Sequence, residues 1–214
     1  MILAIETSGD WCSVAVASGN DLLREVVFRH ERQLLERLPD TVESVLSASG
    51  IDWTQIDRIA AGIGPGSFTG VRVAVTFAKT WAWALGIPVA GVPSLEAAAI
   101  DLLEAGPVVG LAPCRAGQVI AWFGDDDYRV LEIESFERTA RELHPVGSIA
   151  LVGDAAAVVP IAAGFTVVGA TASAAQVARL AALPQWSDRF GAPHDLNPLY
   201  VAPPPIRGHA GIAP

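Results

Sequence analysis

Several features that mark particular classes of protein are scarce in this sequence. Its 214 residues include only two cysteines, Cys12 and Cys114, which lie far apart and are flanked by apolar residues. Two such cysteines make no disulfide framework, so we expect buried free thiols. The four histidines are scattered, and none has a second histidine at the i, i+4 spacing of a helical zinc site. The sequence therefore predicts neither a disulfide-stabilised scaffold nor a metal site.

Charge is also scarce: charged residues make up 17% of the chain and hydrophobic residues 51%. The most apolar window, residues 73–92, is interrupted by Lys79, Gly86 and Pro88, so it is not the span of ~20 apolar residues that a bilayer requires. No signal sequence opens the chain, and we expect a cytoplasmic protein without membrane association. The net charge of −9 disfavours direct contact with nucleic-acid phosphates. Any RNA would have to be held mostly by another molecule.

The most informative stretch of the chain reads strand, glycine turn, helix and strand. The first strand spans residues 58–62, and the turn Gly64-Pro65-Gly66 follows it. Ser67 can cap a helix that continues to about Leu85, where Gly86 stands at the position of a helix C-terminus. A second strand follows, so the stretch predicts a βαβ unit.

A glycine turn that leads into a helix N-terminus can bind an anion through its free backbone amides. The spacing matches neither common nucleotide motif, because a P-loop ends in Gly-Lys-Ser/Thr and this turn continues as Gly70-Val71-Arg72. The alternative is a tight turn that brings the helix close to its sheet. Gly64, Gly66 and Ser67 are the candidate phosphate contacts under the first interpretation.

The order of predicted elements repeats along the chain. The first half has strands at residues 2–7, 11–17, 22–28, 58–62 and 87–92, and helices at residues 31–49, 67–85 and 94–105. The second half has strands at residues 108–112, 118–123, 129–133, 149–153 and 165–168, and helices at residues 136–143, from 155, and 173–183. Two successive βββαβα halves indicate an α/β protein with the duplicated, ribonuclease H-like plan of actin, sugar kinases and chaperone ATPases. We expect lobes at residues 1–106 and 107–200 and a Pro-rich tail at 201–214.

An ATPase of this fold needs a phosphate loop with acidic residues in the first hairpin of each half. The first hairpin offers carboxylates, hydroxyls and amides at Glu6, Thr7, Ser8 and Asp10. These groups could contact a nucleotide, or they could simply satisfy a tight turn. The second hairpin, residues 113–117, has no acidic residue and no hydroxyl. The sequence therefore predicts a catalytically degenerate protein that has no catalytic residues and no cofactor beyond weak ATP or ADP binding.

The helix at residues 67–85 carries side chains that its own sheet cannot all cover. Trp81 and Trp83 are two residues apart and cannot share a helix face. At least one should be exposed as a candidate interface anchor, unless the second half of the chain covers it. Arg72 and Lys79 share a face and could pair with acidic residues of a partner, or they could form a solvated face.

The string GPGSFTGVR, with ILAIETS at the N-terminus and GIPVAGVPSLEA after the helix, closely resembles the TsaB (YeaZ) family. The likeness is dense over residues 1–105. It implies the actin-like fold and a non-catalytic subunit in bacterial synthesis of threonylcarbamoyladenosine, beside the anticodon of ANN-reading tRNAs. It implies three associations: a homologous TsaD-like catalytic subunit, a small TsaE-like P-loop ATPase, and tRNA reached only through the complex.

The resemblance also implies an interaction surface. Proteins of this family pair with the catalytic subunit, and with themselves, through the helices that correspond to residues 31–49 and 67–85. The candidate contacts in this chain are Leu34, Leu35, Leu38, Val42, Arg72, Lys79 and Trp83. The element Asn197–Tyr200 resembles the family's C-terminal Pro-x-Tyr element, but Val201 and Ala202 stand where an arginine commonly follows.

Two other functions are compatible with these residues. One is a weak ATPase or phosphotransferase that uses the first hairpin and the glycine turn, and the missing second phosphate loop argues against it. The other is a stand-alone homodimeric binding protein, which would require the helix surface to be saturated by self-pairing.

Overall fold

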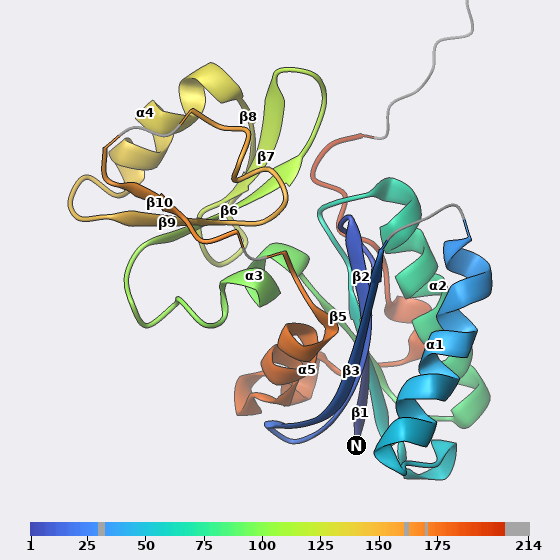
Figure 1. Cartoon of the computed structure of the whole chain (residues 1–214). Helices are drawn as coiled ribbons and strands as arrows, with labels where there is room; N and C mark the ends of the chain where they lie inside the picture. Colours follow the sequence, from blue (N-terminus) through green and yellow to red (C-terminus); the bar gives the residue numbers. More distant parts are fainter. Residues whose placement is uncertain (30–32, 161–162, 170, 204–214) are drawn as a thin grey trace, which may run out of the picture.

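The computed structural model describes residues 1–29, 33–160, 163–169 and 171–203. They form two lobes, each built on a five-stranded mixed sheet (Figure 1). In this part of the chain, no helix combines the length and the apolar character needed to cross a membrane.

The first sheet has the strand order β3-β2-β1-β4-β5. Its strands are β1 (Ile2–Glu6), β2 (Trp11–Ser18), β3 (Asp21–Arg29), β4 (Arg58–Gly62) and β5 (Val89–Val92). The first three form the predicted antiparallel meander, and β4 and β5 extend the sheet in parallel with β1. The predicted βαβ unit is therefore confirmed.

Helices cover both faces of this sheet (Figure 1). On one face lie α1 (Leu34–Ser49) and α2 (Phe68–Leu85), and on the other lies α5 (Ala174–Ala182). Because side chains alternate along a strand, Leu3 of β1 packs under α1 and α2 while Ala4 packs under α5. The small residue on the second face allows α5 to approach the sheet closely.

The helix boundaries of α2 follow from local chemistry. Ser67 caps the helix, because its Oγ accepts a hydrogen bond from the Gly70 amide at 3.2 Å. Gly86 ends it in the left-handed conformation at φ +66°, which glycine adopts without steric cost. Both predicted boundaries are confirmed.

The second sheet has the order β10-β9-β6-β7-β8, which repeats the topology of the first. Its strands are β6 (Val108–Pro113), β7 (Gln118–Trp122), β8 (Tyr128–Glu132), β9 (Ile149–Val152) and β10 (Phe165–Val167). The helix α3 (Ser94–Ala99) packs on one face through Leu95, and α4 (Ile133–Leu143) packs on the other through Phe136. Three short 3-10 helices are η1 (Trp53–Gln55), η2 (Pro184–Arg189) and η3 (Pro193–Asp195). The duplicated α/β architecture is confirmed.

The path of the chain after β10 differs from the predicted division at residues 106/107. Although α5 follows the second sheet in sequence, it packs on the first sheet. Its N-terminal amides are bound there: Ala174 N donates to Ser13 Oγ at 2.7 Å, and Ala175 N donates to Glu25 Oε1 at 3.0 Å. Residues 107–200 therefore do not all lie in one lobe.

Two predicted helices are also corrected. The helix expected at 94–105 ends at Ala99 and continues as turns. The helix expected from Ala155 is a series of turns, in which Ala156 N donates to the Gly153 carbonyl at 3.0 Å and Val158 N to the Ala155 carbonyl at 3.2 Å. Pro160 disfavours helical backbone just before it. The start of the predicted 31–49 helix (Glu31 and Arg32) and most of the Pro-rich tail (204–214) lie outside the described residues.

Candidate functional site

The glycine turn before α2 is packed tightly against the first hairpin. Gly64 has a φ of +88°, and a Cβ atom on Gly66 would overlap the Ser8 carbonyl oxygen. The Ser67 amide donates a hydrogen bond to that same oxygen at 2.6 Å. The backbone geometry therefore explains why glycine is needed at both positions, which supports the interpretation of a tight turn.

Two of the predicted nucleotide contacts lie inside the protein. Thr7 is buried, and its Oγ1 donates to the Gly70 carbonyl at 2.7 Å. Glu6 is also fully buried, and its carboxylate accepts from the Ser8 amide and from Ser94 Oγ, both at 2.7 Å. Since neither side chain reaches the surface, the prediction that Glu6 and Thr7 contact a nucleotide is corrected: they hold the hairpin turn.

The buried carboxyl of Glu6 has no cation beside it among the described residues. Burial raises its pKa, and the hydrogen bonds from Ser8 and Ser94 act in the opposite direction. Gly62 leaves the space for this group, because a Cβ atom there would overlap the Glu6 carboxylate. Ser94 also joins Gly64: Ser94 Oγ accepts from the Gly64 amide at 3.1 Å, and the Ser94 amide donates to the Gly64 carbonyl at 2.8 Å. The predicted phosphate donor at Gly64 is thus already bonded.

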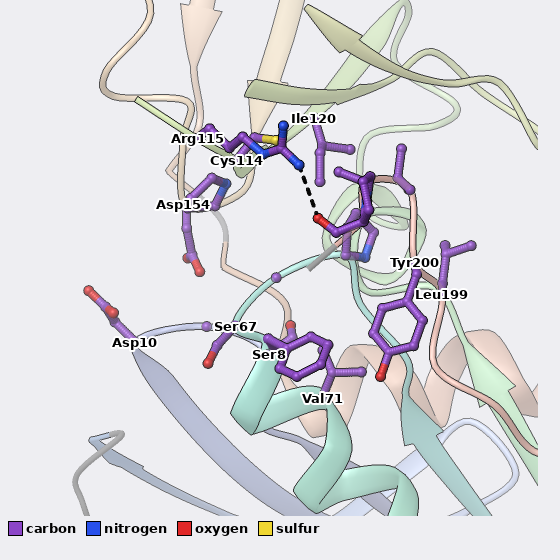
Figure 2. A pocket seen from close by; sticks show the side chains of 18 residues that line it. Ser8, Asp10, Ser67, Val71, Cys114, Arg115, Ile120, Asp154, Leu199 and Tyr200 are labelled. Carbon is purple, nitrogen blue, oxygen red and sulfur yellow. Dashed lines mark hydrogen bonds between the residues drawn. The ribbon is translucent and has the colours of Figure 1, made fainter. Parts of the chain in front are cut away.

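A cavity of about 700 Å³ lies between the two lobes, and we call it the interlobe cleft (Figure 2). Its lining residues are Ser8–Asp10, Pro65–Phe68, Val71, Pro113–Arg115, Ile120, Asp154 and Leu199–Pro203. Of the predicted nucleotide contacts, Ser8, Asp10, Gly66 and Ser67 lie at this cleft. The cleft therefore brings together parts of the first hairpin, the α2 N-terminus, the second hairpin and the C-terminal segment.

Two carboxylates from different lobes stand on the same side of the cleft, with their oxygens toward the space between the lobes (Figure 2). These are Asp10 of the first hairpin and Asp154, which follows β9. Asp154 accepts a hydrogen bond from Thr171 Oγ1 at 2.9 Å. Partial burial raises the pKa of Asp154, and the negative charge of Asp10 also raises it, whereas hydrogen bonds from Thr171 and from the Asp10 backbone act in the opposite direction. The two carboxylates therefore repel each other, although Asp154 is also held by hydrogen bonds from Thr171 and from the Asp10 backbone.

Asp154 and Thr171 are not among the predicted site residues. Asp154 lies directly after a strand that runs parallel to β6. In open α/β sheets, ligand sites gather at the carboxyl ends of such strands, and this position was the available signal.

The C-terminal segment crosses from one lobe to the other beside the cleft. The Leu199 amide donates to the Ile63 carbonyl at 2.9 Å, and the Tyr200 ring lies 5.4 Å from the Phe68 ring between centroids. Further along, Arg115 Nη2 donates to the Pro203 carbonyl at 3.4 Å (Figure 2). The Pro-x-Tyr element therefore packs on the start of α2.

The two cysteines are free thiols, and the described part of the chain has no metal-binding cluster. Both cysteines are free: Cys12 is buried, and burial raises its pKa to about 12, whereas Cys114 is only half-buried at the cleft. Within the described ranges, no group of three or more histidine, cysteine, aspartate or glutamate residues is placed to hold a metal ion.

Comparison with known proteins gives the family. A family model described as TsaD, tRNA N6-adenosine threonylcarbamoyltransferase, matches residues 23–185. The chain is 31% identical over 156 residues to the tRNA threonylcarbamoyladenosine biosynthesis protein TsaB of Escherichia coli, and the match covers 66% of this chain and 67% of that protein. The chain belongs to the TsaB (YeaZ) family.

Other matches of this TsaB-family chain differ in extent. It is 37% identical over 100 residues to TsaB of Bacillus subtilis and 34% identical over 123 residues to TsaB of Haemophilus influenzae. These matches cover 47% and 55% of this chain but only 44% and 51% of those proteins, so the chain spans about half the length of each. A solved structure of YeaZ from Pseudomonas aeruginosa matches at a TM-score of 0.73 and 23% identity, over 94% of this chain and 99% of that one. This last likeness concerns the fold.

The predicted interface residues on α1 and α2 of this TsaB-family chain fall into two groups, one buried and one exposed. Leu34, Leu38 and Val42 are buried in the core between α1 and the sheet. They are not on the surface, and the prediction that they contact a partner is corrected. Leu35 and Trp83 are 61% and 78% exposed.

The other residues of α2 are also placed by the structure. Trp81 packs against Trp53 and Phe77, so it faces inward while Trp83 faces outward. Lys79 Nζ donates to the carbonyls of His194 and Leu196 at 3.2 and 2.9 Å, which use two of its three N–H groups, and its pairing with acids of a partner stays a prediction. Exposed Arg72 lies over the Phe68 ring, 4.7 Å from its centroid.

Proposed function

We propose that this chain is a non-catalytic subunit that binds and activates a TsaD-like threonylcarbamoyltransferase, which modifies the adenosine beside the anticodon of ANN-reading tRNAs. The family membership supports the pathway. The high exposure of Trp83 on α2 is the observation that carries the binding role. A large aromatic side chain at 78% exposure is a typical interface anchor.

The outer face of α2 provides the rest of the proposed surface. Exposed residues recur at three- and four-residue intervals from one end of the helix to the other; they are Phe68, Arg72, Thr76, Thr80 and Trp83. Leu35 of α1 adds an exposed apolar side chain. We infer that a homologous subunit lays its corresponding helices along this face.

The charges on the two helices suit pairing with a related surface. Exposed residues of α1 include three acids, Glu36, Asp40 and Glu43, and one base, Arg37. The helix α2 contains Arg72 and Lys79 and no acid. A homologous subunit arranged about a two-fold axis would place opposite charges together. The same argument supports a homodimer through this surface when the catalytic subunit is absent.

The interlobe cleft supports a role without catalysis. Asp10 and Asp154 would repel the phosphates of a nucleotide, and the first-hairpin acid Glu6 is buried. We place the chain in the cytoplasm with a TsaE-like P-loop ATPase as third member, and tRNA is reached only through the complex. Any binding of ATP or ADP would be weak.

The proposal is tested by size-exclusion chromatography with light scattering, using this chain and the catalytic homologue of the same organism. The parent chain should form a heterodimer, and Trp83→Glu and Leu35→Glu should weaken or abolish it while remaining folded. Val146→Glu is the matched control, because Val146 is 81% exposed but lies in the second lobe. Heterodimers of equal stability from Trp83→Glu and the parent would contradict the proposed surface. Absence of any complex, even with tRNA and the ATPase present, would refute the accessory role and favour the weak-enzyme alternative.

A further inference from the structure

The interlobe cleft has the size and lining of a ligand site. Its volume of about 700 Å³ lies in the range of protein pockets that hold small molecules or short peptide segments. Most of its side chains are apolar, and Phe68, Pro113 and Leu199 contribute from three separate parts of the chain. An occupant should therefore be mainly apolar and should touch both lobes.

Three backbone amides of the glycine turn and the α2 N-terminus are already bonded inside the protein. The Ser67 amide donates to the Ser8 carbonyl, the Gly70 amide to Ser67 Oγ, and the Gly64 amide to Ser94 Oγ. A helix N-terminus attracts anions when such amides are free. Because these three amides are bonded inside the protein, the turn has fewer donors to offer a phosphate.

The charged groups of the cleft favour a cation instead. Asp10 and Asp154 face the space between the lobes, and within the described residues neither carboxylate forms an ion pair with a cationic side chain (Figure 2). Arg115 is the one cationic side chain of the described lining, and it points away from both acids to the Pro203 carbonyl. A cation between the two acids would relieve their repulsion and form charge-assisted hydrogen bonds.

We propose that the interlobe cleft is a docking site for an extended, mainly apolar segment of a partner protein that places one arginine or lysine side chain between Asp10 and Asp154. The apolar residues of the segment pack on Phe68, Pro113 and Leu199. The segment contacts both lobes, so its binding stabilises one arrangement of the lobes. Phe68 belongs both to this cleft and to the proposed helix surface, but Leu35 and Trp83 do not line the cleft, and the test below varies neither of them.

The test uses the full chain and a fluorescein-labelled heptapeptide with a central arginine between leucine and proline residues. Fluorescence anisotropy at low ionic strength should show saturable binding. A peptide with citrulline, the neutral isostere of arginine, should bind about tenfold more weakly, as expected for loss of one charge-assisted interaction. Asp10→Asn and Asp154→Asn should produce the same loss for the arginine peptide and none for the citrulline peptide.

The matched control is Asp188→Asn, which removes an exposed acid of η2 outside the cleft lining. Binding by this variant should equal that of the parent chain, and circular dichroism verifies that all variants are folded. Equal affinities for arginine and citrulline peptides, or no saturable binding of either, would overturn the proposal. Displacement of the peptide by magnesium ATP at lower concentration than by unlabelled peptide would identify a nucleotide site instead. A dimer of this chain that Asp10→Asn dissociates would identify a second copy as the occupant.

Discussion

Replacing Leu38 with alanine should destabilise the protein strongly, although Leu38 was a predicted interface residue. Its side chain is fully buried between α1 and the first sheet. Removing a buried leucine side chain loses its transfer free energy and leaves a cavity, which together cost about 3 kcal/mol. For a chain of this size, each kcal/mol lowers Tm by about 2–4 °C, so we expect a decrease of about 6–12 °C.

The neighbouring leucine provides the control for this experiment. Leu35 is 61% exposed, so Leu35→Ala should change the free energy of unfolding by no more than about 0.5 kcal/mol. Thermal and urea unfolding can be followed by tryptophan fluorescence, because Trp53 and Trp81 pack together in the same lobe. A loss below about 1 kcal/mol for Leu38→Ala, or equal losses for both variants, would show that α1 is rotated relative to the structure described here.

Two further predictions concern the first hairpin and the glycine turn. Burial raises the pKa of Glu6 above its ordinary 4.5, so the folded state binds a proton more tightly than the unfolded chain does. The free energy of unfolding should therefore fall as pH rises from that ordinary value through the raised folded-state pKa, and Glu6→Gln should flatten this part of the profile. Urea titrations across this pH range measure the effect, and parallel profiles for the two proteins would contradict it. Gly66→Ala should lose about 1–3 kcal/mol, because its Cβ atom would overlap the Ser8 carbonyl oxygen. Gly191→Ala, whose Cβ would meet open space, should be nearly neutral, and equal urea midpoints for the two alanine variants would refute the close approach.

Local chemistry was enough to predict the elements around the glycine turn. A capping hydroxyl at Ser67 and a left-handed glycine at Gly86 act within one turn of the helix ends, so the sequence alone located α2. The same is true of the antiparallel meander, which needs only short turns between alternating strands. The repeated order of the predicted strands and helices then indicated the duplicated α/β fold.

The parts that sequence reasoning missed depend on residues far apart in the chain. The placement of α5 relies on Ser13 and Glu25, which accept hydrogen bonds from residues more than a hundred positions later. The proximity of Asp10 and Asp154 depends on how the two lobes pack against each other. For α1, the four-residue spacing of Leu34, Leu38 and Val42 did define one face, but it is the face that packs on the sheet, and Leu35 stands outside it.

The return of α5 to the first sheet makes the second lobe an insertion within the first. A fragment that stops at residue 106 would lack the helix that covers Ile2, Ala4 and Ala15, and would expose this apolar face of its sheet to water. During synthesis, the same face stays open until residues 174–182 leave the ribosome, long after all five strands of the sheet have been made. The first lobe can therefore finish folding only after the chain of the whole second lobe has emerged.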